Sequence, residues 1–289
     1  MAIDYAKLKS WRFPPLMQSY SEKDVILYAL AVGVGQNPID PIQLRYTFEK
    51  NLRALPTVAT VLATPGFWMR DEGTGIDWRQ LLHGEQRTQF HAPIPISGSV
   101  YSEMRVLSIS DKGQGKGAIV VSQRKLLSEA GELLATLQQS TFCRGNGGYS
   151  ADGQSNDPGP EPLPAVPQRP PDATVEVASR PEAALLYRLA ADPNPLHADP
   201  DVAHAAGFDR PILHGLATYG MAGQAVVFAC CGGDASRLRA FDTRFTAPVY
   251  PGETLLVDIW REGARTHFRG RIASRNVVVL SNGIALIED

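Results

Sequence analysis

The 289-residue sequence contains only three cysteines, Cys143, Cys230 and Cys231. Three thiols are too few for a disulfide framework, and the adjacent pair Cys230 and Cys231 would make a poor structural bridge. The N-terminus lacks the basic stretch and apolar run of a secretory signal. The C-terminus lacks an ending of the Ser-Lys-Leu peroxisomal type. We therefore expect a protein of the reducing cytoplasm.

Long apolar runs and an excess of one charge are also missing. No run approaches the roughly 20 apolar residues that a helix needs to cross a bilayer, which predicts no membrane span. The 28 Lys and Arg residues nearly balance the 30 Asp and Glu residues, giving a net charge of −2. This balance gives no reason to expect nucleic acid as a partner. Hydrophobic residues make up 44%, which is ordinary for a globular protein.

A polar, proline-rich stretch, residues 151–171, separates two halves of comparable size, 1–150 and 172–289. Its centre reads Asp157-Pro158-Gly159-Pro160-Glu161-Pro162. Proline lacks a backbone N–H and fixes φ, so the stretch cannot sustain a helix or a central strand. We expect a linker there, with one folding unit on each side.

Matching features recur in the two halves at a distance of about 155–160 residues. Each half begins with a helix-start pattern, at Ser21 and at Ser179, that runs into an Asn-Pro loop. An apolar helical segment follows, about 56–63 in the first half and 216–230 in the second. Strand-like runs close each half, at 100–107, 118–121, 254–259 and 276–280. The pattern predicts a duplicated α+β unit in which a helix packs on a curved antiparallel sheet.

The clearest chemical signal is the run Asp192-Pro193-Asn194-Pro195-Leu196-His197. Its two prolines stiffen the backbone and keep their neighbours out of a helix. One rigid loop therefore presents a carboxylate, an amide and an imidazole. An acid/base pair of this kind suits proton transfer, provided that both groups reach one substrate.

The duplication fails at this run. When the Asn-Pro pairs of the two halves are superposed, Gly35 lies opposite Asp192 and Asp40 lies opposite His197. The first half thus keeps the scaffold without the acid/base pair. We predict one functional centre per chain, in the second half, with the first half free to shape the binding cavity.

The second half resembles the hydratase 2 motif of MaoC-like dehydratases, the (R)-specific 2-enoyl-CoA hydratases. The resemblance is specific in the Asp-x-Asn-Pro-Leu-His run and covers nearly the whole chain. It rests on residues 187–197, 205–208, 211–216 and 244–252, and, for the longer two-repeat members, on 82–86 and 111–113. Ala191 departs from the family, which usually has Gly before the Asp.

The resemblance implies a double hot-dog fold, in which a long helix in each half is wrapped by an antiparallel sheet and the halves pair as a pseudo-dimer. The implied reaction is the reversible addition of water to a trans-2-enoyl-CoA, giving a (3R)-3-hydroxyacyl-CoA. The implied partner is an acyl-CoA thioester. No metal and no cofactor beyond the CoA of the substrate are implied, and a homodimer of the double hot-dog is possible.

The resemblance also implies roles for single residues. Asp192 and His197 would hold and activate the water and shuttle protons, with Asn194 orienting the pair or the water. We hypothesise that the backbone N–H of Gly215, at the start of a helix, stabilises the developing oxyanion. Lys112 would pair with a CoA phosphate. Substrate contacts are implied for His83, Gly84, Lys112, Pro193, Pro195, Leu196, His214 and Phe245.

Plainer interpretations stand beside these roles. The Asp192 loop also fits an Asx-type turn with a structural histidine. His214 before a helix is as readily structural as functional, and Lys112 fits a solvated turn. A metal site is a further alternative, because four possible ligands lie close in sequence, although their spacing fits no standard zinc pattern. These four are His197, Asp199, Asp201 and His204.

Competing functions use the same motif differently. A dehydratase of 3-hydroxyacyl thioesters would run the reaction in reverse, on CoA or on a carrier protein. A non-catalytic acyl-CoA binding module would not need both Asp192 and His197. A hot-dog thioesterase would hydrolyse the thioester, but the Asp-x-Asn-Pro-Leu-His run does not indicate a thioesterase. We therefore predict a hydro-lyase.

Overall fold

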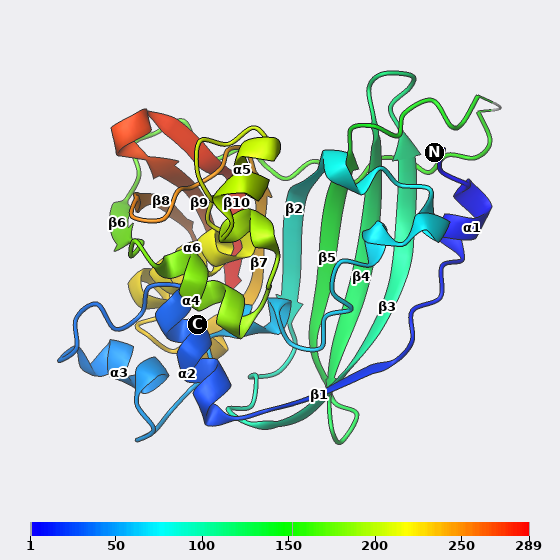
Figure 1. Cartoon of the computed structure of the whole chain (residues 1–289). Coiled ribbons are helices and arrows are strands. Elements are labelled where there is room, and N and C mark those ends of the chain that lie inside the picture. Colours follow the sequence, from blue (N-terminus) through cyan, green and yellow to red (C-terminus); the bar gives the residue numbers. More distant parts are fainter. Residues whose placement is uncertain (1, 152, 289) are drawn as a thin grey trace.

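The computed structural model describes residues 2–151 and 153–288, and its strands form one ten-stranded antiparallel sheet in the order β1-β3-β4-β5-β2-β7-β10-β9-β8-β6 (Figure 1). The first half contributes β1 (Leu16–Tyr20), β2 (Leu81–Phe90), β3 (Gly98–Asp111), β4 (Ala118–Ser128) and β5 (Leu133–Cys143). The second half contributes β6 (Ala173–Ala178), β7 (Leu238–Phe245), β8 (Thr254–Glu262), β9 (Arg265–Ile272) and β10 (Val277–Ile287). Counted outwards from the β2–β7 pair, the strands of both halves follow in the same order.

The β2–β7 pair carries the internal symmetry down to single residues. Glu85 lies opposite Arg244, and Arg87 lies opposite Asp242. Each strand thus contains an acid-x-Arg triplet, and the antiparallel register sets each acid against the other strand's arginine. Opposite charges at directly opposed positions favour strand pairing. The two halves are therefore joined by a pseudo-two-fold contact.

The second half has the long central helix that the sequence predicts. Helix α6 (Gly215–Cys230) packs against β6, β7, β8 and β10, and its residues from Ala217 to Val227 are all buried. Many of them are Ala or Gly, which lets the helix approach the sheet closely. Three shorter elements precede it, α4 (Ala183–Ala190), the 3₁₀ turn η5 (Pro195–His197) and α5 (Pro200–Ala205).

The two predicted helix starts have different outcomes. Ser21 begins α2 (Glu22–Ala31) as expected, through a capping box with Asp24. The prediction at Ser179 is wrong by three residues, because Glu182 is the N-cap of α4. The Ser179 hydroxyl instead accepts the backbone N–H of Gly252 at 2.9 Å. That contact depends on the β7–β8 loop, which the local sequence pattern does not reveal.

The long helix expected at 56–63 in the first half is replaced by the short 3₁₀ turn η1 (Pro56–Thr60). The segment is rich in β-branched residues, and Pro65 disfavours continuation of a helix through the preceding residue. The guanidinium of Arg124, buried on β4, donates to the carbonyls of Leu62, Ala59 and Thr60. A tertiary donor therefore satisfies carbonyls that a longer helix would pair internally.

The rest of the first-half cover consists of short elements. The sheet face near β3 and β4 is covered by α1 (Tyr5–Lys9) and by the 3₁₀ turn η2 (Trp68–Arg70), which share a hydrophobic cluster with it, and the turn η3 (Glu72–Thr74) contacts η2. The turn η4 (Trp78–Gln80) leads into β2, and α3 (Pro41–Thr47) follows α2. Trp68 packs against Trp11 and Phe13. No helix in the described part of the chain is both long and apolar enough to cross a membrane.

The described residues of the proline-rich connection, between the end of β5 and the start of β6, form no helix or strand. Its backbone carbonyls accept hydrogen bonds from strands of both halves. The indole N–H of Trp260 on β8 donates to the carbonyl oxygen of Arg169 at 2.8 Å. The side-chain amide of Asn282 on β10 donates to the carbonyl oxygen of Leu163 at 3.1 Å. Near the other end, Asp157 accepts from Lys9 of α1. The connection is thereby fixed to the sheet.

Candidate active site

The loops that precede two equivalent helix caps differ in length between the two halves. Asp40 caps α3 and Asp199 caps α5, each followed by Pro at the first helical position. The second half has two more residues between its Asn-Pro pair and this Asp-Pro cap than the first half has. On this alignment Asp40 matches Asp199, so His197 has no direct counterpart. The first half therefore has no residue in register with this imidazole.

The loop of Asp192 is an Asx turn, as the plainer interpretation suggested. Asp192 Oδ1 accepts the backbone N–H of Asn194 at 3.0 Å. Asn194 Oδ1 in turn accepts the backbone N–H of Leu196 at 3.1 Å and caps η5. These bonds leave Oδ2 of Asp192 unoccupied among the described residues, in an exposed side chain. The turn fixes the carboxylate and leaves one of its oxygens available to a ligand.

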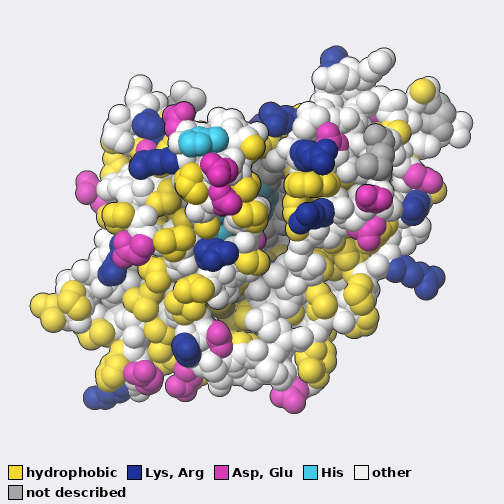
Figure 2. Space-filling model, in the orientation of Figure 1, with side chains coloured by type: hydrophobic (Ala, Val, Ile, Leu, Met, Phe, Trp, Pro, Cys, Tyr) yellow, Lys and Arg dark blue, Asp and Glu magenta, His cyan; other side chains and the backbone are white. Residues whose placement is uncertain are grey.

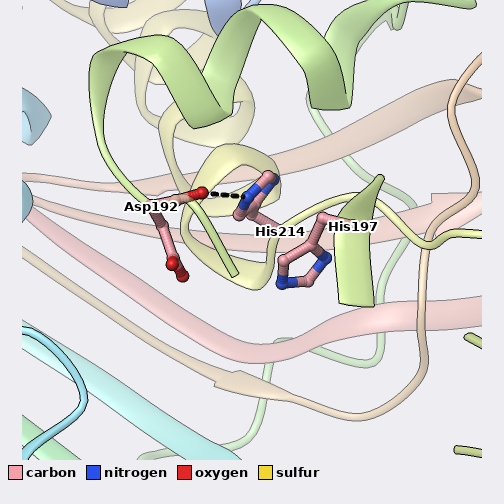
Figure 3. Close-up of side chains that lie close together, drawn as sticks. All are labelled: Asp192, His197 and His214. Atoms are coloured by element: carbon pink, nitrogen blue, oxygen red, sulfur yellow. Dashed lines mark hydrogen bonds between the residues drawn. The ribbon is translucent and has the colours of Figure 1, made fainter. Parts of the chain in front are cut away.

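His197 is buried and oriented by the backbone. Its Nδ1 lies 2.8 Å from the carbonyl oxygen of Ile212. Because a carbonyl only accepts, Nδ1 carries the proton and Nε2 keeps its lone pair. Burial lowers the pKa of His197, and the Ile212 carbonyl and the Asp192 charge oppose that shift. The ring is therefore a neutral base at pH 7 that faces the same space as the Asp192 carboxylate (Figure 3).

His214 lies behind this pair. Its ring stacks on His197 with centroids 3.7 Å apart and an interplanar angle of 30°. Its Nε2 donates to the backbone carbonyl of Asp192 at 3.0 Å (Figure 3). Its other face meets the ring of Tyr187 at 4.7 Å. Burial lowers the pKa of His214 to about 3, so it stays neutral. His214 thus touches both members of the acid/base pair.

Helix α6 begins next to this cluster. His214 is its N-cap residue but makes no side-chain capping bond; its Nε2 donates to the Asp192 carbonyl, and its Nδ1 has no hydrogen-bond partner among the described residues. The N–H groups of the first turn are donors at the positive end of the helix dipole. A Cβ on Gly215 would lie 3.5 Å from the Phe245 ring, an ordinary contact distance. Packing therefore does not require a glycine at this position, and the N–H of Gly215 has no acceptor among the described backbone contacts.

The first half contributes His83 on β2. Its ring lies 4.5 Å from that of Phe245 on β7. Burial lowers the pKa of His83 to about 4, and its Nε2 is buried without a hydrogen-bond partner in the described structure. Through Phe245 the ring of His83 joins the Gly215 end of the site. Figure 2 shows the surface hollowed between the two halves, with histidine side chains visible inside the hollow.

Other predicted site residues lie elsewhere or have structural contacts. Lys112 is exposed in the β3–β4 turn, where a Cβ on Gly159 of the linker would lie 3.1 Å from its Nζ. Within the described contacts it meets none of the groups near Asp192. Gly84 forms a β-bulge, and a Cβ there would lie 3.2 Å from the carbonyl of Ser140. Pro193 and Pro195 are exposed on the loop, and Leu196 is half-buried.

The metal alternative finds no support in the geometry. Candidate ligand atoms of Asp192, His197 and His214 lie within 4.8 Å of one another. Imidazole lone pairs lie in the ring plane, so two stacked rings direct them side by side instead of towards one ion. One nitrogen of each ring is also held by a backbone carbonyl. Asp199 is used as a helix cap, and His204 binds the carbonyl of Asp209 at 2.8 Å.

Sequence reasoning missed one residue of the site and one surface cluster. Tyr187 stands behind His214, although it forms part of the motif run. Arg70, Trp78 and Arg79 form a surface cluster just before β2. A tryptophan with arginines at −8 and +1 is no recognised motif, and only the 3₁₀ turns bring the three side chains together.

The chain is similar to known proteins over nearly its whole length. Residues 163–282 match the MaoC like domain, and residues 18–145 match the MFE-2 hydratase 2 N-terminal domain. An enoyl-CoA hydratase of Mycobacterium tuberculosis is 38% identical over 291 residues, with 99% of each chain covered. The structure of a MaoC-like dehydratase from Phytophthora capsici has a TM-score of 0.86 at 29% identity and covers 99% of both chains.

A further Mycobacterium tuberculosis protein, described as a double hot-dog fold, is similar with a TM-score of 0.53 over 99% of this chain and 98% of its own. At 14% identity this likeness concerns the fold alone. The predicted double hot-dog architecture is confirmed, with η1 in place of the first central helix. The chain belongs to the MaoC-like dehydratase family.

Proposed function

We propose that the protein is an (R)-specific enoyl-CoA hydratase that adds water reversibly to a trans-2-enoyl-CoA. The observation that carries the proposal is the pairing of the open Asp192 carboxylate with the unprotonated Nε2 of His197, next to the free N–H groups that begin α6. Hydration of an enoyl thioester needs a base for water, a proton for the α-carbon and a donor for the carbonyl. These groups supply all three.

The proton transfers balance on the pair. Asp192 and His197 hold one water molecule; as its oxygen bonds to C3, the pair takes a proton from it. The electrons of the double bond move towards the thioester oxygen, where the N–H of Gly215 stabilises the charge. The pair then returns a proton to C2, and the enzyme regains its starting protonation state. Dehydration of the 3-hydroxyacyl thioester follows the same steps in reverse.

We assign His214 as a positioning residue in place of the substrate contact predicted from the sequence. Its hydrogen bond fixes the backbone at Asp192, and its ring fixes the plane of His197. A buried ring whose Nε2 is already bonded is poorly placed to touch an acyl chain. Asn194 acts in a similar way, by holding the turn from which Asp192 projects.

The proposal includes a cytoplasmic location and a role in fatty-acid metabolism such as β-oxidation. Three free cysteines agree with a reducing compartment. A homodimer of the double hot-dog is part of the same expectation, and light scattering of the purified protein tests it.

Loss of enoyl absorbance tests the reaction. The purified protein is mixed with crotonyl-CoA, and a dehydrogenase specific for the (R)- or (S)-alcohol identifies the product. D192N and H197N should each lower kcat by roughly 10²–10⁴-fold, the usual contribution of general acid–base catalysis. Their circular dichroism and melting temperature serve as the fold control. Release of free thiol from crotonyl-CoA, or full activity in either variant, would refute the assignment.

A further inference from the structure

Two arginines contact the ring of Trp78, which lies just before the start of β2. The guanidinium carbon of Arg70 lies 5.0 Å from the centre of its ring, and that of Arg79 lies 5.3 Å away. Phe67 meets the ring edge-on at 6.0 Å and is itself exposed. Both arginines are exposed. Two like charges therefore gather around one aromatic ring at the surface.

Two of the three other arginines that lie over an aromatic ring in the described part of the chain pair with a carboxylate; the third, Arg210, lies 5.1 Å from the centre of the Tyr250 ring without such a pair. Arg275 lies over Tyr250, and its guanidinium forms an ion pair with Glu253. Arg269 lies over Trp260 in the same way and pairs with Asp258 at 2.8 Å. In these cases the stacked arginine is part of a structural ion pair.

The Trp78 cluster lacks such a partner. Within the described residues, no carboxylate lies within 4.0 Å of Arg70 or Arg79. The acids next to them in sequence accept from turn backbone and amide groups. Asp71 accepts the N–H of Gly73 at 2.8 Å, and Asp77 accepts the side-chain amide of Gln80 at 2.8 Å and the backbone N–H of Arg79 at 3.3 Å. Two guanidiniums without a paired carboxylate repel each other, and an anion that contacts both would relieve that repulsion.

The cluster stands within reach of the active site. The turn η4, which contains Trp78, leads directly into β2, and His83 follows five residues later. Five residues span at most about 18 Å when fully extended. His83 contacts Phe245, which borders Gly215. An extended pantetheine arm has this order of length. Figure 2 shows basic side chains along both rims of the hollow.

We propose that Arg70, Trp78 and Arg79 form the subsite for the phosphate groups of a coenzyme A thioester. This inference rests on the proposed hydratase function and names the thioester class. Guanidinium groups bind phosphate through two parallel N–H donors, and stacking on the indole holds their planes in place. Both guanidinium carbons lie within 5.3 Å of the centre of one ring, so they are at most about 10 Å apart and can contact phosphate groups of one nucleotide. An acidic carrier protein spreads its charges over a much wider surface.

The test compares two substrates that share one reactive end. Crotonyl-CoA carries the nucleotide, and crotonyl-pantetheine lacks it. In the double variant R70Q/R79Q the KM for crotonyl-CoA should rise roughly tenfold, equivalent to the loss of about 1.4 kcal/mol of binding. Its kcat, and both constants for crotonyl-pantetheine, should stay at the wild-type values. R105Q is the matched control, because Arg105 is also exposed but pairs with Gln123 on β3 and β4.

The remaining outcomes are decisive in either direction. An unchanged KM for crotonyl-CoA overturns the subsite, and so does an equal rise for both substrates. A loss confined to a crotonyl-carrier protein overturns it in favour of an acidic protein partner. Should the wild-type protein hydrate neither small substrate, the hydratase function fails, and calorimetric binding of free CoA decides the subsite alone. Weaker binding in R70Q/R79Q than in R105Q supports it, and equal binding refutes it.

Discussion

The ring of His214 stacks on the ring of His197 with centroids 3.7 Å apart, and its Nε2 holds the backbone carbonyl of Asp192. One buried side chain therefore fixes the orientation of the base and the position of the acid at once. This double contact links the start of α6 to the irregular loop, although the two are separate in sequence.

Two variants of His214 separate its two contacts. H214F keeps an aromatic ring against His197 but loses the donor to the Asp192 carbonyl. H214Q keeps an amide donor at a similar reach and loses the ring. If both contacts position the pair, each variant should lower kcat roughly tenfold to a hundredfold with little change in KM. Steady-state kinetics with crotonyl-CoA measures this. A change in KM alone would instead mean that His214 binds the acyl group.

The activity should persist below the ordinary pKa of histidine. Burial lowers the pKa of His197, and catalysis uses its neutral form. The acid limb of kcat/KM should therefore lie below pH 6.5, the ordinary value for histidine. A pH–rate profile for crotonyl-CoA between pH 4.5 and 8 measures it, in steps of about half a unit. A fall of kcat/KM on the acid side with a midpoint above pH 6.5 would mean that a group other than His197 acts as the base.

The same burial predicts acid-sensitive stability. The folded-state pKa of His214 is about 3, against about 6.5 for an exposed imidazole. Below pH 6.5 the unfolded chain binds a proton that the folded chain refuses, so stability falls as the pH falls towards 3. The loss for this residue is on the order of 3 kcal/mol by pH 4. Urea unfolding at pH 7, 5.5 and 4.5 measures the fall, and H214F should reduce it.

Replacing two glycines of α6 by alanine should have different effects, on activity at Gly215 and on stability at Gly223. In G215A the new Cβ meets Phe245 at 3.5 Å, so the melting temperature should change little. Its kcat should fall, because the methyl group covers the N–H that polarises the thioester. In G223A the new Cβ would lie 2.6 Å from Thr57 Cγ2, which predicts a loss of about 1–3 kcal/mol. Wild-type kcat in a stable G215A would remove the oxyanion role.

Arg124 should be important for stability instead of catalysis. Its guanidinium satisfies three carbonyls between Ala59 and Leu62, in and just after η1, and burial lowers its pKa to about 10. R124Q leaves several acceptors without a donor, which predicts a loss of about 3 kcal/mol. Urea denaturation measures this, with R105Q as the surface control. A loss no larger than that of R105Q would mean that water replaces the guanidinium at no cost.

The sequence predicts elements that depend on neighbouring residues. The capping box of Ser21 and Asp24 is complete within four residues, so α2 begins where expected. Helix α6 is a long apolar run with few competing signals. The segment 56–63 is also apolar, but its state depends on Pro65 and on Arg124 from a distant strand. A local pattern does not contain that donor.

The site residues show the same difference between local sequence signals and distant contacts. The Asp192 loop is stiffened by its own prolines, and its chemistry was visible in the sequence. The stacking of His214 depends on how α6 enters the sheet, so a substrate contact and a structural role were equally open. Lys112 was carried over from a family position, and the fold places it in a hairpin turn against the linker. Non-local packing decides such cases.

The matched triplets at the centre of the sheet carry a consequence for how such chains arise. Glu85 and Arg87 on β2 face Arg244 and Asp242 on β7. A strand with acid-x-Arg is complementary to a second copy of itself in antiparallel register, because each acid then meets an arginine. A lone repeat with this triplet would assemble as an isologous homodimer with two identical centres. With both triplets in one polypeptide, the same strand pair holds the two halves together although only the second half carries the acid/base pair.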